Sequence, residues 1–250
     1  MHLTILTGAS RGLGRAMAAQ LLAADRLLLT IERTPDPTLA EAARAAGATL
    51  EQWALDVAHD VGVAARLEGW LRQQRGASFA SATLINNAGA IGSVGPIDLA
   101  PADEIATVLR VGLEAPLVLT AAFLRATGDW ACARRVLNVS SGAGRNPIAG
   151  WAPYCAAKAG LDHFTRVTAL DEARRPNGAR IVSLAPGVID TAMQQHLRAA
   201  DAAGFPDKQR FVDLHANAQL AAPQAAATRV LAYLARADFG KNPVADVRDA

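Results

Sequence analysis

A tyrosine and a lysine four residues apart carry the clearest chemical signal in this sequence. Tyr154 and Lys158 fall in an alanine-rich stretch of helical period, so we expect them on one face of a helix, one turn apart. Ser141 leaves the end of an apolar run just before them. This group suits carbonyl reduction, because Ser141 can donate a hydrogen bond to a substrate oxygen while Tyr154 delivers a proton to it.

The lysine matters because a phenol with a pKa near 10 is a poor acid-base group at neutral pH. An ammonium ~4 Å from the phenol, in surroundings of effective dielectric ~20, favours the phenolate by ~4 kcal/mol, or about 3 pKa units. We therefore expect Lys158 to lower the pKa of Tyr154. In isolation, an exposed Tyr-Lys pair on an amphipathic helix explains the same spacing.

A glycine-rich segment near the N-terminus is typical of a dinucleotide site. Thr7–Gly14 joins the first apolar run to an alanine-rich helical stretch. Glycines permit a tight turn, and the start of a helix offers free N–H groups to a pyrophosphate. The turn alone can be purely structural, but its place at the first strand–helix junction favours a cofactor. The expected cofactor contacts here are Gly8, Ser10, Arg11, Gly12, Leu13 and Gly14.

Two residues of opposite charge follow the second apolar run and bear on the choice of cofactor. Glu32 can accept hydrogen bonds from an adenosine ribose, which favours NAD(H), whereas Arg33 can pair with the 2′-phosphate of NADP(H). Arg11 can reach the same phosphate. Two arginines against one glutamate favour NADP(H), with NAD(H) as the alternative. Glu32 and Arg33 can also be read as exposed loop charges.

Polar residues also follow the third and fourth apolar runs. Ligands bind at the carboxyl edge of doubly wound sheets, so we expect Asp56 to hold the adenine amino group. Asn87, Ala88 and Gly89 are expected beside the cofactor for the same reason. The pair Asn86-Asn87 is also compatible with ordinary turn chemistry.

The elements that must position these residues form a regular series. Short runs of Leu, Ile and Val alternate with alanine-rich helical stretches, the pattern of βα units around a parallel sheet. The expected strands are Leu3–Thr7, Arg26–Ile31, Thr49–Leu55, Ala82–Asn86, Arg135–Ser140, Arg180–Ala185 and Val244–Val247. The expected helices are Gly14–Ala24, Thr38–Gly47, Val61–Arg75, Pro101–Thr127, Pro153–Arg175, Asp207–Ala218 and Pro223–Ala237.

This series predicts the fold class α/β, with a single Rossmann-like, doubly wound parallel sheet of about seven strands and helices on both faces. No repeat or linker interrupts it, so we expect one NAD(P)-binding domain over residues 1–250. The segment Gly187–Pro206 is the longest irregular stretch and a natural substrate lid.

Composition argues against several other classes. The 250 residues are 51% hydrophobic and 19% charged, with a net charge of +2, too weak a field to favour a nucleic-acid or membrane partner. Cys132 and Cys155 have no neighbours at metal-ligand spacing and cannot build a disulfide framework. The first apolar run begins at Leu3, and no stretch approaches about 20 apolar residues, so we expect a cytoplasmic protein without a metal.

Taken together, the motifs resemble the short-chain dehydrogenase/reductase family over nearly the whole chain. They are Thr7–Gly14, Asn86–Gly89, Ser141, the Tyr154–Lys158 pair and Pro186–Thr191. The resemblance implies that Ser141, thirteen positions before the tyrosine, is catalytic rather than Ser140. It also implies cofactor contacts from Tyr154, Lys158, Pro186, Gly187, Ile189 and Thr191, with the nicotinamide carboxamide bound by the Ile189 backbone and Thr191.

One departure from the family pattern concerns a proton relay. The family usually has an asparagine where this chain has Gly112, at a helix kink whose main-chain carbonyl holds a water linked to the lysine. Glycine can keep the kink and the carbonyl but loses the side chain. We therefore expect the relay to be weakened or served by water.

Within the family, Pro186–Gln194, Gly204–Pro206 and Asp246–Asp249 resemble the sepiapterin reductase and benzil reductase branch. The resemblance implies NADPH-dependent reduction of vicinal dicarbonyls or pterin side-chain ketones, with Asp246 as a candidate anchor for a pterin-like substrate. Trp151, Met193 and Phe205 are candidates for an apolar pocket, although each can simply be core or lid packing.

The resemblance also implies a homodimer or homotetramer, with subunit contacts through Pro101–Thr127 and Pro153–Arg175. Three functions remain open. The leading one is an NADPH-dependent reductase of small carbonyl substrates. An NAD-dependent alcohol dehydrogenase is favoured by Glu32, and a non-catalytic dinucleotide-sensing protein is supported by Gly112 alone.

Overall fold

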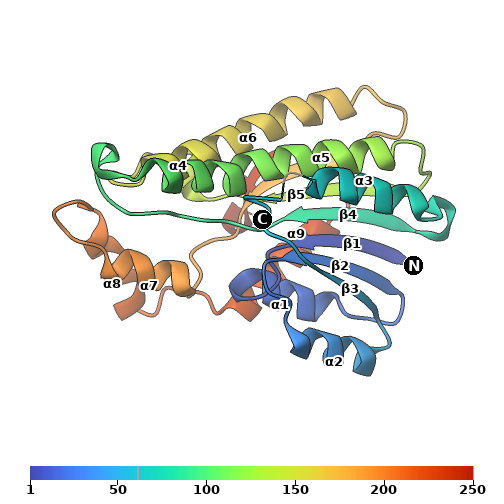
Figure 1. The fold of residues 1–250 in the computed structure, drawn as a ribbon, viewed down its shortest axis with the longest axis horizontal. Helices are drawn as coiled ribbons and strands as arrows, with labels where there is room; N and C mark the ends of the chain where they lie inside the picture. The colour runs from blue at the N-terminus through green and yellow to red at the C-terminus, as the bar shows by residue number, and fades with distance from the viewer. Residues whose placement is uncertain (61, 250) are drawn as a thin grey trace.

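Seven parallel strands form one sheet in the computed structural model, which describes residues 1–60 and 62–249 (Figure 1). The strands are β1 His2–Thr7, β2 Arg26–Glu32, β3 Thr49–Ala54, β4 Ser81–Asn86, β5 Ala133–Val139, β6 Arg180–Ala185 and β7 Val244–Asp246. Their order is β3-β2-β1-β4-β5-β6-β7, with every pair parallel. Strands β2 and β3 are therefore added on one side of β1, and β4 to β7 on its other side. This reversal of strand order between β1 and β4 confirms the predicted doubly wound fold.

Helices cover both faces of this sheet. They are α1 Gly12–Leu21, α2 Pro37–Ala46, α3 Val63–Gln73, α4 Ala102–Leu109, α5 Ala115–Ala126, α6 Ala152–Glu172, α7 Ala192–Ala199, α8 Lys208–Ala216 and α9 Pro223–Ala235. Figure 1 shows α3, α4, α5 and α6 on one face and α1, α2 and α9 on the other. The pair α7–α8 lies beyond the carboxyl ends of the strands.

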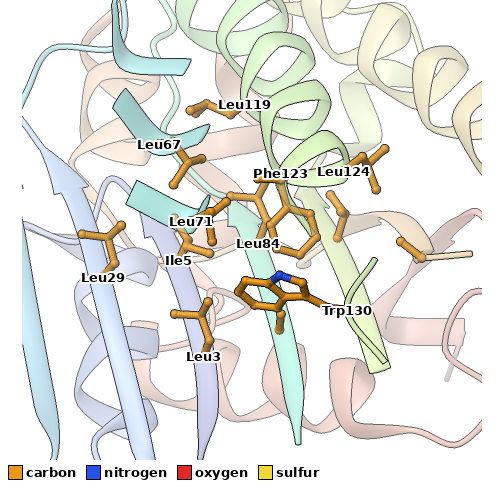
Figure 2. Close-up of a cluster of buried hydrophobic side chains, with 14 of the residues drawn as sticks. Leu3, Ile5, Leu29, Leu67, Leu71, Leu84, Leu119, Phe123, Leu124 and Trp130 are labelled. Carbon is orange, nitrogen blue, oxygen red and sulfur yellow. The ribbon is translucent and has the colours of Figure 1, made fainter. Parts of the chain in front are cut away.

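Two cores form because successive strand residues point to opposite faces. In β1, Leu3 and Ile5 enter the core under α3 and α5, whereas Leu6 enters the core under α1 and α9. Figure 2 shows the first core, in which side chains of α3 and α5 such as Leu67 and Phe123 meet the strand residues. Burial on both faces explains why central strands such as β1 and β4 read as largely apolar runs, whereas the edge strand β3 is only partly buried.

The predicted helix Pro101–Thr127 has the expected extent but not the expected continuity. A π-helical turn, Arg110–Glu114, separates α4 from α5. Within it, a Cβ atom on Gly112 would lie 3.1 Å from the Cβ of Ala157 in α6. The helix distortion anticipated at Gly112 is therefore present, and the missing side chain lets α6 approach closely.

The predicted lid Gly187–Pro206 is not an irregular stretch, which corrects the sequence interpretation. It contains α7, whose Leu197 and Gln194 are buried. Eight residues give too short an apolar pattern to be distinguished from a loop by periodicity. For the predicted helix Val61–Arg75, Val61 lies outside the described residues and α3 begins at Val63.

Ala102–Ala126 is long and apolar enough to span a membrane by length and composition alone. Half of its most apolar window is buried inside the protein. Its Leu119 and Phe123 belong to the core of Figure 2, so it resembles the core helix of a soluble protein.

Candidate active site

Ser141, Tyr154 and Lys158 meet at the carboxyl edge of the sheet. Ser141 follows β5 in extended conformation and starts a 3-10 turn, where its Oγ accepts a hydrogen bond from Ala143 N at 3.2 Å. Tyr154 and Lys158 lie in the first two turns of α6, and Lys158 Nζ is 5.6 Å from the centroid of the Tyr154 ring. The helical spacing read from the sequence therefore places the phenol and the ammonium side by side.

The phenol of Tyr154 is held in an apolar environment. Only 6% of the residue is exposed, and the Trp151 ring stacks on it with 4.4 Å between centroids and 14° between planes. Burial raises the pKa of Tyr154 to about 12, and the nearby Ser141 side chain opposes this shift as a hydrogen-bond partner. The phenol is therefore protonated throughout the neutral range.

Lys158 is buried as well and donates from Nζ to the carbonyl oxygen of Val139 at 2.8 Å. Burial lowers the pKa of Lys158 to about 8, and the negative charge of Asp162 opposes this shift. The expected lowering of the Tyr154 pKa is not found, because removal from water raises the pKa of the phenol more than its surroundings lower it. The pair thus holds a protonated phenol rather than a phenolate.

The glycine-rich turn has little room for side chains. Gly8 and Gly12 have φ angles of 72° and 55°, in the left-handed region that favours glycine. A Cβ atom on Gly14 would lie 2.0 Å from Gly8 O. Within the described residues, no side-chain hydrogen bond caps the start of α1, so the N–H groups of its first turn remain available to a ligand. Of the other expected contacts, Ser10 is half-buried, Arg11 is exposed and Leu13 is a core residue.

The two asparagines at the end of β4, Asn86 and Asn87, have different roles. Asn87 Nδ2 donates to Thr7 O and Gly8 O, while the N–H groups of Asn87 and Ala88 donate to Thr7 Oγ1 at 3.0 Å each. These bonds fix the glycine-rich turn against the end of β4, with Gly89 exposed beyond it. Asn86 points into the protein instead, where its Nδ2 donates to Asn138 Oδ1 at 2.8 Å.

The loop after β6 reaches the same edge. Gly187 has a φ angle of 81°, and a Cβ atom on Gly12 would lie 3.4 Å from Thr191 Cγ2. Pro186 and Ile189 are buried. An isolated parallel β-bridge between Ile189 and Ala221 joins this loop to the segment just before α9. The two glycine-containing segments thus approach each other closely at the carboxyl edge of the sheet.

The charged residues near the predicted adenosine end have different environments. Glu32 is only 4% exposed, and its Oε1 accepts from Thr30 Oγ1 at 2.9 Å and Gln52 Nε2 at 3.3 Å. Its Oε2 is buried without a hydrogen-bond partner among the described residues, and burial raises the pKa of this carboxyl. Arg33 is exposed. Asp56 is half-buried at the end of β3, and its Oδ1 accepts from Ala58 N at 2.9 Å.

The residues suggested for an apolar pocket come together around Tyr154. Trp151 and Phe205 are buried, and Met193 packs against the same cluster. The rings of Trp151 and Phe205 are 6.5 Å apart. Asp246 is engaged by a neighbour, since its two carboxylate oxygens accept from Arg248 Nε at 2.8 Å and Nη2 at 2.6 Å. As a substrate anchor, Asp246 must exchange or share this partner.

A buried carboxylate beside the site was missed by the sequence analysis. Asp162 lies one turn after Lys158 and is 1% exposed. Its Oδ1 accepts from Ser140 Oγ and Ser183 Oγ. The four-residue spacing from Lys158 was a signal for it, but an aspartate in a helix usually faces solvent.

Comparisons with known proteins agree with this geometry. The family model for short chain dehydrogenases matches residues 2–202. A benzil reductase ((S)-benzoin forming) from Bacillus cereus is 33% identical over 244 residues and covers 98% of each chain. A sepiapterin reductase from Xenopus tropicalis is 34% identical over 220 residues, 84% of this chain and 82% of the relative. A solved metagenomic short-chain oxidoreductase in complex with NADP has a TM-score of 0.72 at 26% identity, covering 98% of this chain and 94% of that one.

Proposed function

Because the chain belongs to the short-chain dehydrogenase/reductase family of oxidoreductases, we propose that it is an NADPH-dependent reductase of small ketones and vicinal dicarbonyls. The observation that carries this proposal is the protonated, buried phenol of Tyr154 beside Ser141 and Lys158. The names of two relatives, benzil reductase and sepiapterin reductase, support a carbonyl substrate.

A nicotinamide dinucleotide fits the residues at the sheet edge. The glycine-rich turn leaves no space for a Cβ atom at Gly14, and the uncapped N-terminus of α1 suits a pyrophosphate. Gly8, Gly12, Asn87 and Thr191 lie on the segments at the sheet edge that would hold it. When bound, the reduced nicotinamide supplies the hydride.

The chain's own residues handle the substrate oxygen and the proton. We infer that Ser141 Oγ donates a hydrogen bond to the carbonyl oxygen and fixes its position. Tyr154 holds the proton at its Oη and transfers it as that oxygen gains negative charge. An alkoxide is a stronger base than a phenolate of pKa about 12, so the transfer is favourable. Lys158, with its ammonium beside the ring, stabilises the phenolate that remains.

Two exposed arginines support the preference for NADPH. Arg11 and Arg33 are the cations available to a 2′-phosphate at the end of β2. Glu32 is turned inward by Thr30 and Gln52, and its buried Oε2 would have to turn outward to accept a ribose hydroxyl. The place of this carboxylate at the end of β2 keeps NAD(H) as the second candidate. An NAD-dependent alcohol dehydrogenase is the corresponding alternative activity.

Cofactor choice is tested by Arg33→Ser, with Arg44→Ser, an exposed arginine on α2, as the matched control. Loss of a charge-assisted phosphate contact is expected to raise KM for NADPH about tenfold or more while KM for NADH stays unchanged. Equal effects on both cofactors, or none, would contradict the assignment of Arg33. Glu32→Gln is expected to weaken NADH binding if NAD(H) is the working cofactor.

We further propose one domain over the chain, a cytoplasmic location, a homodimer or homotetramer, and a substrate lid that includes α7. The lid is supported by the packing of Phe205 and Leu197 with Trp151 against Tyr154. The assembly is supported by three exposed apolar residues on α5 and α6, Val118, Val167 and Leu170.

The direct test of the activity is the decrease in absorbance of NADPH, and separately of NADH, with benzil, an aliphatic ketone and a pterin ketone. Turnover of benzil with NADPH is expected. Cofactor binding without turnover of any carbonyl would instead support a dinucleotide-sensing protein, and Gly112→Asn would then be the first reversion to examine.

A further inference from the structure

We propose that Asp162 is a positioning residue, which holds Ser141 in place through the residues on either side of the serine and supports the positive charge of Lys158 one helical turn earlier. The proposal rests on the proposed roles of Ser141 and Lys158. It assigns to one buried carboxylate the support of two groups that come from different elements, β5 and α6.

The first oxygen of Asp162 joins α6 to the residue after β5 and to the interior of β6. Oδ1 accepts from Ser140 Oγ and from Ser183 Oγ, both at 2.6 Å. Ser140 directly precedes Ser141, and its N–H donates to Leu184 O in β6 at 2.9 Å. The backbone that leads into Ser141 is therefore fixed by both β6 and α6.

The second oxygen faces the segment that follows Ser141. Oδ2 lies 3.4 Å from Nε of Arg145, and a Cβ atom on Gly144 would lie 3.1 Å from it. Arg145 in turn donates from Nη2 to Ala245 O in β7 at 3.1 Å. Ser141 is thus held between two partners of the same carboxylate, one before it and one after it.

The charge of Asp162 also acts along α6. Lys158 lies one turn earlier, and the charge of Asp162 opposes the fall in the Lys158 pKa that burial causes. The other charged group facing the carboxylate is Arg145, whose own field reaches Asp246 in β7. The remaining partners, Ser140 and Ser183, are neutral. Loss of the carboxylate charge therefore leaves two cations, Lys158 and Arg145, without this counter-charge.

Asp162→Asn separates the charge from the packing. The amide keeps the volume of the side chain and an oxygen for the two serines, but it places an NH2 group opposite Arg145. The matched control is Asp171→Asn, on the same helix at an exposed position. The measurements are kcat/KM for a ketone against pH, KM for NADPH and the melting temperature.

For Asp162→Asn we expect kcat to fall about tenfold, with KM for NADPH changed little. The alkaline limb of the pH profile, set by Lys158, is expected to move to lower pH by about one unit, because the ammonium loses a neighbouring negative charge. Asp171→Asn should leave both unchanged. A residue that only pins α6 to the sheet would lower the melting temperature without moving the alkaline limb.

Two serine variants keep the proposal testable if Asp162→Asn does not fold. Ser140→Ala and Ser183→Ala each remove one donor to Oδ1 and leave the carboxylate charge in place. Ser140→Ala is expected to lower kcat more than Ser183→Ala, because Ser140 adjoins Ser141, and neither should move the alkaline limb.

Equal serine effects, or a wild-type kcat and pH profile in Asp162→Asn, would overturn the positioning role. Absence of turnover in the wild-type protein would instead contradict the proposed function itself.

Discussion

At the residue scale, the site is governed by the removal of two polar groups from water. Tyr154 and Lys158 are both almost fully buried, and burial favours the neutral form of each group. It raises the pKa of the phenol to about 12 and lowers the pKa of the amine to about 8. A neutral phenol is the form that can donate a proton to a substrate oxygen. The direction of the Tyr154 shift therefore favours carbonyl reduction at neutral pH, where Lys158 with a pKa of about 8 is still mostly an ammonium.

Tyr154→Phe tests the proton donor. The variant keeps the ring that stacks on Trp151 but loses the hydroxyl, so turnover is expected to fall by about 10²- to 10⁴-fold while cofactor affinity is retained. Steady-state reduction and NADPH binding by fluorescence measure the two quantities. Tyr233→Phe, in α9, is the matched control because the chain has only two tyrosines. Unchanged turnover in Tyr154→Phe would contradict the mechanism.

The pH profile tests the lysine. Because the pKa of Lys158 is about 8, the ammonium is lost as pH rises through that value, and kcat/KM for reduction is expected to decline above it. The same shift bears on stability. The folded-state pKa lies below that of the unfolded chain, so the unfolded state binds more protons between about pH 8 and about pH 10.4, and the lysine's contribution to stability should rise with pH across that window. A flat rate profile across this range would show that the charge of Lys158 is not needed.

At the element scale, the site depends on close approach between turns and helices. Three turns bring the chain into close contact with a neighbouring segment. They are the glycine-rich turn, the π-helical turn at Arg110–Glu114 and the 3-10 turn after Ser141. Each such place tolerates little additional volume, because interiors are closely packed.

Gly14→Ala tests this dependence. The added Cβ atom would lie 2.0 Å from Gly8 O and 2.5 Å from Asn87 Nδ2, so the turn must deform and we expect loss of measurable cofactor binding. Gly69→Ala is the control, since nothing lies within 4 Å of its Cβ position in α3. Alanine there should stabilise the helix by about 0.5–1 kcal/mol. Thermal melting and NADPH titration of both variants measure the difference, and normal binding by Gly14→Ala would refute the close-packed turn.

At the scale of the whole molecule, α5 and α6 combine a buried face with exposed apolar residues. Leu170 is 67% exposed on α6, and Val167 on α6 and Val118 on α5 are also exposed. Burial of such large apolar side chains against a partner subunit removes them from water. This supports the proposed assembly through these helices.

Leu170→Glu is expected to shift the protein from dimer or tetramer toward monomer, because a carboxylate is costly to bury in an apolar interface. Sedimentation velocity measures the change. Leu99→Glu, at a leucine that is 75% exposed outside α5 and α6, should leave the assembly intact. A monomeric wild-type protein, or identical behaviour of the two variants, would exclude this face as the subunit contact.

The sequence alone determined the framework of this protein. Apolar runs and glycine positions predicted about seven strands, a parallel sheet and the segments that meet at the carboxyl edge, because periodicity and turn chemistry are local properties. They also placed Tyr154 and Lys158 one turn apart, because helical spacing alone brings residues i and i+4 together. The family assignment followed from these motifs and is confirmed.

Only the tertiary structure decided the environments of those residues. Asp162 contacts Ser140 and Ser183, which are distant from it in sequence. Three other contacts are local but depend on how the side chains are buried: the inward turn of Glu32, the pairing of Asp246 with Arg248 and the stacking of Trp151 on Tyr154. Helix α7 was missed because its eight residues are too few to show a clear helical period in the sequence, and its buried residues are defined only by packing in the folded protein. The pKa of Tyr154 rose instead of falling because desolvation is a property of the folded interior, which residue spacing does not contain.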